Sequence, residues 1–438
     1  MKKLIALLLV LAMVLSFAAC SGDPAEAPAD NGNQGAANSG DAGKDASSDP
    51  VTITWAINET ANLTREQYMV ITKAFEDAHP GIKVELKLFS NDEKDFVTQI
   101  AAGTLADISH NMADLANLEG VWAEVPADLQ AKWDPQYLFE ANGVVNAVPV
   151  CGQGHYSVIY HKAEFEALGL QEPKTWAEFL AVCDAFVANG KAPLMGWGAG
   201  NADFFCEAWA CVNLSNYLKA NYDNFNASLR DGSAKWTDAG IIDVIKEFQT
   251  WNSNGYYYAG SASLDYSNAQ VEFKNGAAPM MIDGVWALTG LDDAEYGMFF
   301  LPEISGSNYL SEYMCYWGVS EASENKEAAW TFVDWVLTGD GLAYYTEQIL
   351  SHDAQVSFIE GAPSYEMDPL VQEYYDGYKG ERQAYNSDLF VAGDNALPAG
   401  FEPYLCSELS KIFFDNQDVE TTMQTVQAEY ERFLADQG

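Results

Sequence analysis

Carboxylates, amides and aromatic rings gather just after the first three predicted strands of this chain. They are Trp55 and Glu59 after the first strand, Asn91 after the second, and Asp107, Asn111 and Asp114 after the third. Such polar side chains exchange hydrogen bonds with hydroxyl groups, and exposed rings stack on flat C–H faces. Because no cluster of Arg or Lys accompanies these residues, an anionic ligand is disfavoured. The set predicts a binding site for a polar molecule that is not an anion.

The elements that position these side chains follow from hydrophobic periodicity. Val51 begins a β-branched run typical of a strand, and residues 64–78 place apolar side chains on one helical face. The run from Ile82 to Leu88 alternates as a second strand. A further helix is expected over residues 95–102 and a third strand from Ala106. This βαβαβ order predicts a parallel sheet with ligands at the carboxyl ends of its strands.

The motifs of common enzyme classes are absent from the sequence. There is no Gly-x-Ser-x-Gly, no P-loop, no GxGxxG and no HExxH, and the five histidines are scattered. We therefore expect no cofactor, no metal site and no catalytic residue. A glycosidase stays open as an alternative, because that chemistry needs only two of the 64 Asp and Glu residues at a set separation.

Charge and cysteine content restrict the partners. The formal net charge of −42 repels nucleic acid and anionic lipid headgroups. Six cysteines lie within the ordered part of the chain, none in a CxxC pair or a zinc pattern. We expect buried free thiols, although an exported location would permit a disulfide. These six are Cys151, Cys183, Cys206, Cys211, Cys315 and Cys406.

The N-terminus predicts export. Lys2 and Lys3 precede an apolar run from Leu4 to Phe17, and Ala18 and Ala19 then lead to Cys20. This arrangement resembles the bacterial lipoprotein signal, in which the cysteine is acylated and becomes the new N-terminus. The resemblance implies a signal peptide over residues 1–19 and lipidation at Cys20. The alternative is ordinary secretion with an incidental cysteine. Residues 20–49, rich in Gly, Ala, Asn and Ser, are expected to form a flexible tether.

Five segments, in order along residues 50–438, resemble the extracellular solute-binding proteins of carbohydrate ABC importers, the maltodextrin-binding kind. They are Phe75–Glu85, with its Pro-Gly turn; Val148–Val150 together with Val158–Lys162; Pro173–Phe179, which contains Pro-Lys-Thr-Trp; Phe273–Trp286, with the Phe, Gly, Met, Gly, Trp pattern; and Ser320–Trp330. The chain departs from the family at Gly103–Asp107, where a Gly-Asp-x-Pro-Asp stretch is common. It also carries His161 where the family usually has Asn.

The resemblance implies an α/β, two-lobed periplasmic-binding-protein-like fold. Each lobe is expected to be a mainly parallel sheet flanked by helices, and crossing hinge strands join the two. Carried onto this chain, lobe 1 covers residues 50–150 plus 303–350, and lobe 2 covers 151–302 plus 351–438. Gly152 and Gly154 lie where the chain first crosses, in a stretch suited to a bend or to a plain structural turn.

Matched to the family, Glu59, Asn111 and Asp114 resemble sugar contacts, and Trp286 resembles the main stacking tryptophan. The resemblance adds further candidates around the same cleft: Asp203, Phe204, Asp283 and Phe401, with Tyr156 and Trp317 near the crossing strands. Core packing is the alternative for Tyr156, Trp286 and Trp317.

The function that the resemblance implies is capture of a sugar, expected to be an oligosaccharide, and its delivery to an ABC importer. The implied partners are that carbohydrate and the permease subunits of the importer, with no nucleic acid. We expect a monomer on the outer face of the cell membrane, held only through its lipid anchor. A binder of another solute, such as a peptide or a polyamine, stays open, as does a purely structural surface lipoprotein.

Overall fold

A computed structural model of the chain describes residues 50–436 apart from 61, 89–92, 112–119, 142, 155, 200–201, 358, 360, 382, 388, 390–395 and 399. The predicted signal peptide, the predicted tether and Cys20 therefore lie outside the described residues. The described residues belong to one compact unit, which runs from Asp49 to Gly438.

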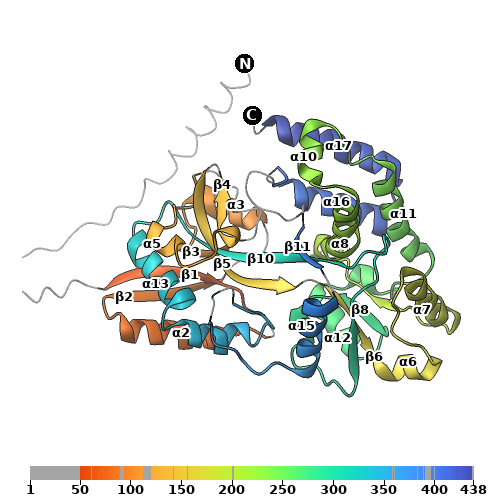
Figure 1. Cartoon of the computed structure of the whole chain (residues 1–438), viewed down its shortest axis with the longest axis horizontal. Coiled ribbons are helices and arrows are strands. Elements are labelled where there is room, and N and C mark those ends of the chain that lie inside the picture. The colour runs from red at the N-terminus through yellow and green to blue at the C-terminus, as the bar shows by residue number, and fades with distance from the viewer. Residues whose placement is uncertain are drawn as a thin grey trace, which may run out of the picture. The chain divides into compact units, whose positions relative to one another are not determined.

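The described strands form two sheets (Figure 1). The larger sheet has the order β2-β1-β3-β10-β5-β4, with β11 paired to β10, and the smaller has the order β7-β8-β6-β9. The strands are β1 (Val51–Ile57), β2 (Ile82–Leu88), β3 (Ile108–Asn111), β4 (Phe139–Ala141), β5 (Val144–Gly154), β6 (Ser157–His161), β7 (Leu194–Met195), β8 (Met280–Asp283), β9 (Tyr296–Phe299), β10 (Tyr309–Val319) and β11 (Gln383–Asn386).

Helices cover both sheets. In Figure 1 the helices around the larger sheet lie on the left of the molecule, and those around the smaller sheet lie on the right. The α-helices are α2 (Arg65–Ala78), α3 (Glu93–Ala102), α5 (Ala127–Gln130), α6 (Lys162–Leu168), α7 (Trp176–Ala188), α8 (Ala202–Trp209), α9 (Ser215–Asn221), α10 (Phe225–Asp231), α11 (Ala239–Ser253), α12 (Tyr266–Lys274), α13 (Lys326–Thr338), α14 (Leu342–Tyr345), α15 (Pro369–Glu381), α16 (Phe401–Phe414) and α17 (Val419–Asp436). The short helical segments are η1 (Pro135–Tyr137), η2 (Ala210–Leu214), η3 (Ser261–Ser263), η4 (Val285–Leu288) and η5 (Thr346–Leu350), of which η2 and η5 are π-helical.

The predicted βαβαβ opening is confirmed. Strand β1 pairs in parallel with β2, from Val51 opposite Ile82 onward, and also with β3. Helix α2 begins after Thr64, and the Gln67 side chain accepts a hydrogen bond from the Thr64 backbone N–H at 2.6 Å. That contact is half of a capping box, which a Thr followed three residues later by Gln predicts.

The two-lobed fold is confirmed with one correction, because neither sheet is mainly parallel. In the larger sheet, β10 runs antiparallel to β3 and to β5, and β4 runs antiparallel to β5. In the smaller sheet, β6 runs antiparallel to both β8 and β9. The periodicity of the opening predicts only the strands joined by helical crossovers. The later strands join the sheets through other kinds of connection. For these connections the sequence does not predict whether neighbouring strands are parallel or antiparallel.

The chain passes from the larger sheet to the smaller after β5 and returns to the larger sheet before β10. Strand β5 belongs to the larger sheet and β6 to the smaller, while β9 of the smaller sheet is followed by β10 of the larger. The predicted lobe boundaries stay a prediction. Strand β11, within the range assigned to lobe 2, pairs in parallel with β10 of the larger sheet.

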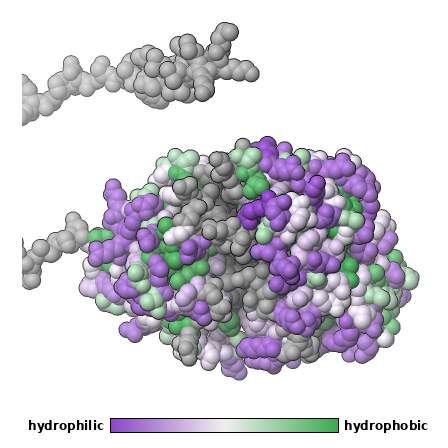
Figure 2. Space-filling model, turned by 45° about the horizontal axis from the view of Figure 1, so that its top comes forward, coloured by the Kyte–Doolittle hydropathy of each residue, from purple (hydrophilic) through white to green (hydrophobic). Residues whose placement is uncertain are grey.

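Hydrophilic residues cover most of the visible described surface, with small separate hydrophobic patches (Figure 2). Within the described ranges, no helix is long and apolar enough to cross a membrane. The six cysteines of the ordered part are buried thiols, as predicted.

Candidate functional site

Three predicted residues meet at the carboxyl end of β8. Asp283 is the last residue of this strand, Trp286 follows in η4, and the ring of Tyr156 stands edge-on to the Trp286 ring at 5.6 Å between centroids. Tyr156 and Asp283 are buried, whereas Trp286 is partly exposed. A partly exposed ring fixed against a buried ring suits stacking on a flat ligand face.

A hydrogen-bond network holds the Trp286 ring through its indole N–H. The hydroxyl of Tyr266, the first residue of α12, donates to the Asp283 carboxylate at 3.0 Å. The same hydroxyl accepts hydrogen bonds from the Trp286 Nε1–H at 2.9 Å and from Gln270 Nε2 at 2.8 Å. Tyr266 therefore links the carboxylate, the indole and an amide at one point.

Asp283 carries a shifted pKa because it is completely buried. Burial raises the pKa of its carboxyl from the ordinary 3.8 to about 6. Hydrogen bonds from the Gly284 N–H, at 2.8 Å, and from Tyr266 and Gln270 oppose the shift because they favour the charged form. Burial, with the Asp283 carboxylate adding to it, raises the pKa of Tyr266 well above its usual range. Tyr266 is therefore a neutral donor at every physiological pH.

Gly284 makes room for the tryptophan. A Cβ built at this position would lie 2.2 Å from Cη2 of the Trp286 ring, so the ring covers the glycine backbone. The φ angle of −77° is open to any residue, so the requirement is purely steric. A larger residue at position 284 would push the ring out of place.

The side of the larger sheet contributes Asn62 and Asp353. Asn62, between β1 and α2, donates a long hydrogen bond of 3.5 Å to the Trp286 carbonyl. Asp353 accepts a hydrogen bond from Gln355 Nε2. After burial, the Asp353 charge adds to the raised pKa of Tyr68 on α2 and of Tyr266 on α12. Asp353 therefore lies within electrostatic reach of helices that belong to both sheets.

The segment that carries Asp353 has unusual backbone. It follows the π-helix η5, and Ala354 has a left-handed φ of 51° although it is not glycine. π-Helical turns and left-handed non-glycine residues occur often at functional sites. The Tyr375 hydroxyl of α15 holds the segment through a 2.7 Å hydrogen bond to the Ala354 carbonyl.

Several predicted site residues lie in the core instead. Trp55 is 1% exposed and packs edge-on against Trp317, at 5.0 Å, and against Tyr68. Trp317 is 2% exposed. Phe401 has no exposed surface and packs on Trp236 and Tyr430 within the second lobe. None of the three offers an exposed ring face in this structure, so none can stack on a ligand in this conformation.

Asp107 lies at the wrong end of its strand for the predicted role. Strand β3 begins at Ile108, so Asp107 precedes the strand rather than following it. Its carboxylate accepts hydrogen bonds from the Thr54 N–H and hydroxyl, both at 2.7 Å, and from the Ser323 hydroxyl at 2.5 Å. These contacts join β1 to the chain after β10, which is a structural task.

The other predicted residues are only partly described. The Glu59 carboxylate pairs with Arg65 at 2.6 Å and stays partly exposed. Asn111 ends β3, and Asp203 and Phe204 lie in the first turn of α8; their side chains are outside the described residues. Asn91 and Asp114 lie outside the described residues altogether.

Sequence reasoning missed Asn62, Tyr266, Gln270 and Asp353. Asn62 lies in the same loop after β1 as Glu59. The rule that ligands bind at the carboxyl ends of parallel strands therefore also applies to Asn62. Gln270 follows Tyr266 by four residues on one helix face, a spacing that a helix brings together. Nothing local links Tyr266 to Asp283 or brings Asp353 within electrostatic reach of both Tyr68 and Tyr266, because those relations depend on the tertiary fold.

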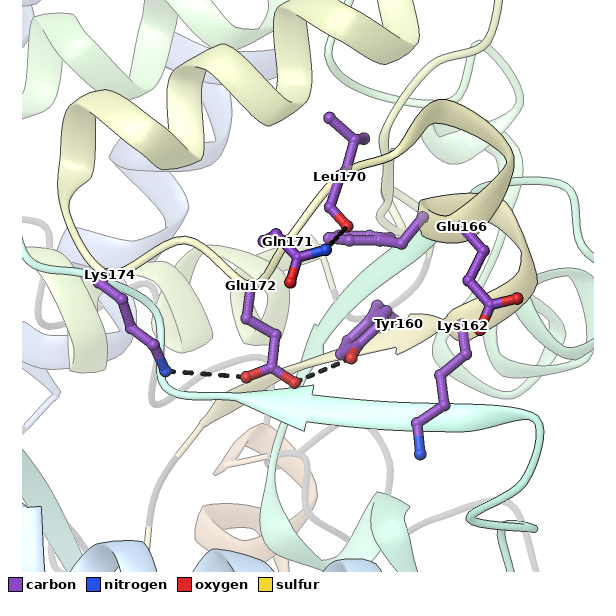
Figure 3. A pocket seen from close by; sticks show the side chains of 8 residues that line it. Tyr160, Lys162, Glu166, Leu170, Gln171, Glu172 and Lys174 are labelled. Atoms are coloured by element: carbon purple, nitrogen blue, oxygen red, sulfur yellow. Dashed lines mark hydrogen bonds and ion pairs between the residues drawn. The ribbon is translucent and has the colours of Figure 1, made fainter.

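A separate hollow of about 480 Å³ lies in the second lobe, away from these residues (Figure 3). Three of its polar side chains bond to one another: Glu172 accepts from the Tyr160 hydroxyl at 2.8 Å and pairs with Lys174 at 3.8 Å. Figure 3 shows Glu172 between these two partners. The hollow is lined by Tyr160, Lys162, Phe165, Glu166, Leu170, Gln171, Glu172 and Lys174.

Residues 60–341 match the family model described as bacterial extracellular solute-binding protein, well over half of the chain. The chain belongs to that family. It is 24% identical over 270 residues to the maltotriose-binding protein of Pyrococcus abyssi, covering 59% of this chain and 55% of that protein. It is 20% identical over 274 residues to an uncharacterized ABC transporter extracellular-binding protein of Pyrococcus horikoshii, covering 57% of this chain and 60% of that protein. The chain thus matches less than two thirds of the length of these relatives.

Solved structures share the fold over a longer span. A chitin oligosaccharide binding protein superposes with a TM-score of 0.75 at 20% identity, covering 89% of this chain and 100% of that one. A sugar transporter protein of Bacillus licheniformis, in complex with stachyose, superposes with a TM-score of 0.68 at 16% identity, covering 87% of this chain and 100% of that one.

Proposed function

We propose that this protein captures a sugar, expected to be an oligosaccharide, between its lobes and delivers it to an ABC importer. The observation that carries the proposal is the partly exposed Trp286 ring. Tyr156 and the Tyr266 hydroxyl fix this ring, with Asn62 of the other lobe beside it. Aromatic planes beside fixed carboxylates and amides suit the C–H faces and hydroxyls of a sugar. Names of similar proteins that mention maltotriose and chitin oligosaccharide support the same ligand class.

The site can supply the binding free energy for a sugar without a metal or a cofactor. Micromolar affinity requires about 8 kcal/mol. Stacking on Trp286, with a handful of hydrogen bonds to charged groups at about 1.5–3 kcal/mol each, supplies that after ordering costs. On this proposal the protein does no chemistry on its ligand, and the importer hydrolyses the ATP.

The test is thermal melting of residues 50–438 against maltotriose, raffinose, stachyose and chitin oligosaccharides. A ligand at one hundred times its dissociation constant stabilises the folded state by about 2.7 kcal/mol, which shifts the midpoint measurably. A shift with one sugar family supports the proposal and identifies the ligand class. No shift with sugars, together with a shift on adding spermidine or a peptide library, overturns it in favour of a non-sugar solute.

We further propose that Cys20 carries the lipid anchor on the outer face of the cell membrane, and that the receptor acts as a monomer. Several acyl chains bind durably because each buried methylene adds about 0.8 kcal/mol. Cys20→Ser should abolish incorporation of a labelled fatty acid and release the protein into the medium. Retention of the variant in the membrane fraction would contradict lipidation at this residue.

A further inference from the structure

Two cysteines face each other where the chain passes between the sheets. Cys151 on β5 and Cys315 on β10 are directly opposite in the antiparallel register. Cys151 lies three residues before the end of β5, after which the chain enters β6 of the smaller sheet. Strand β10 follows β9, which belongs to the smaller sheet. The pair therefore joins the two strands on which a hinge between the lobes depends.

The geometry of the pair suits a disulfide. Residues opposite one another in an antiparallel ladder have Cα atoms about 4.5–5.5 Å apart. A disulfide accepts Cα separations of about 4.4–6.8 Å, so the bond needs little backbone movement. The register also shifts between Cys315 and Tyr316, and such an irregularity gives the backbone local freedom. Among the strand pairs of the described ranges, no other joins two cysteines.

Both thiols are almost completely enclosed, with 1% exposure for Cys151 and 2% for Cys315. Burial raises the pKa of the Cys151 thiol well above its usual range, and the neighbouring Cys315 thiol adds to that shift. The Cys151 thiol donates a 2.7 Å hydrogen bond to the Gln355 side chain, which in turn donates to Asp353. The reduced pair is thus connected to the Asp353 segment.

We propose that Cys151 and Cys315 form a disulfide in the presence of an external disulfide oxidant, and that this bond fixes the two crossing strands to each other. An extracellular protein meets such oxidants. One cysteine thiolate attacks the oxidant disulfide and releases one thiolate. The second cysteine thiolate then attacks the protein-bound sulfur and releases the other. Two protein thiols are oxidised, the oxidant is reduced to two thiols, and these take up the two protons.

Oxidation has two structural consequences. The bond adds a covalent tie across β5 and β10, which restricts the local opening of both strands. It also removes the Cys151 S–H, so the Gln355 carbonyl loses its donor and the Asp353 segment loses one of its contacts. The redox state of the pair is therefore expected to change hinge freedom.

The experiment refolds the full chain with and without a reduced and oxidised glutathione mixture, because refolding exposes both thiols before they are buried. Free thiols are then alkylated, and the peptides are mapped by mass spectrometry. After refolding with the glutathione mixture, we expect a Cys151–Cys315 link in the wild type. The same link is expected in Cys183→Ser, a matched control that removes another buried thiol. No such link is expected in Cys315→Ser or Cys315→Ala. Absence of this link, or a link only between other cysteines, overturns the proposal.

Hydrogen exchange then tests the mechanical claim. In the oxidised wild type, amides of β5 and β10 should exchange at least several-fold more slowly than in the reduced protein, and thermal unfolding should need a higher temperature. Cys315→Ser should show no difference between the two treatments. A link that forms without changing exchange in these strands overturns the claim that it fixes the hinge.

Discussion

Trp286 and Asp283 are three residues apart, yet their burial suits them to different tasks. The Trp286 side chain is partly exposed, whereas the Asp283 carboxylate is completely buried and acts through Tyr266. In the proposed site the tryptophan therefore touches the ligand, and the carboxylate fixes the tryptophan's position.

The first prediction concerns the ring itself. Trp286→Ala should weaken sugar affinity at least tenfold, about 1.4 kcal/mol, because the stacking surface is lost. The protein should stay folded with a lower unfolding midpoint, because the ring's packing against Tyr156 and its hydrogen bond to Tyr266 are lost. Titration calorimetry with the sugar found by melting measures the effect. Trp335→Ala, which removes another half-buried indole far along α13, is the matched control and should keep its affinity. Equal affinities of Trp286→Ala and wild type would remove the ring from the site.

The second prediction concerns the Tyr266 hydroxyl. Tyr266→Phe leaves the Asp283 carboxylate and the Trp286 N–H without their shared partner, so affinity should fall several-fold and stability by about 1–2 kcal/mol. Tyr256→Phe removes a similar hydroxyl–carboxylate contact, 2.7 Å to Asp184, away from the site. That control should lose stability without losing affinity. Loss of affinity in both variants, or in neither, would contradict a positioning role for Tyr266.

The third prediction follows from the raised pKa of Asp283. Because the folded protein holds this proton more tightly than the unfolded chain, the carboxyl's favourable contribution is complete below pH 3.8 and is lost as pH rises through about 6. A shift of this size corresponds to about 3 kcal/mol. Urea unfolding from pH 4 to 7 should show a less negative slope of stability against pH for Asp283→Asn than for wild type. Parallel curves would mean that Asp283 does not titrate in this range.

At the scale of elements, local patterns predicted the opening of the fold but not the site. Strand β2 and helix α2 follow their hydrophobic repeats almost to the residue. Strand β3 begins at Ile108, two residues later than the predicted start at Ala106, so Asp107 precedes the strand instead of following it. A short strand has too few residues to fix its own limits, and the site depends on such limits. The antiparallel pairs of β10 depend on long-range contacts that no repeat encodes.

The fourth prediction belongs to the turn after β8. Gly284→Ala places a Cβ within 2.2–2.4 Å of the Trp286 ring, so the ring must move and affinity should fall at least several-fold. The free energy of unfolding should fall less than for a core substitution, since the displaced ring is partly exposed. Gly81→Ala is the matched control, because a Cβ there meets nothing within 4 Å and its φ is not left-handed. Crystal structures of both variants would show the ring directly, and an unmoved ring would contradict the steric argument.

The fifth prediction separates structure from binding at β3. Asp107→Ala removes the acceptor that joins Thr54 to Ser323, so stability should fall by about 2 kcal/mol while sugar affinity is unchanged. Asp77→Ala, which breaks an exposed ion pair with Lys73, should leave the unfolding midpoint unchanged. Denaturant unfolding and calorimetry measure the two effects. A large loss of affinity in Asp107→Ala would return this residue to the binding site.

For the whole molecule, the proposed function requires an open and a closed arrangement of the two lobes. A ligand favours the closed arrangement only if it binds that arrangement more tightly than the open one. The ligand must therefore contact both lobes. Asn62 is where the two sides already meet, through its hydrogen bond to the Trp286 carbonyl. Sugar binding should therefore reduce the radius of gyration of residues 50–438 in small-angle scattering. Asn62→Ala should weaken both affinity and compaction, because a contact specific to the approach of the lobes is lost.

Asn221→Ala separates this effect from the loss of any amide. The Asn221 side chain donates to the Tyr217 carbonyl at 2.8 Å, a bond that stays within one lobe. Removing it leaves the difference between open and closed states untouched, so affinity and compaction should match wild type. If the sugar binds Asn62→Ala with full affinity and full compaction, Asn62 plays no part in closure. The approach of the lobes would then depend on ligand contacts with other residues, of which Asp353 is the first to test, through Asp353→Asn in the same assay.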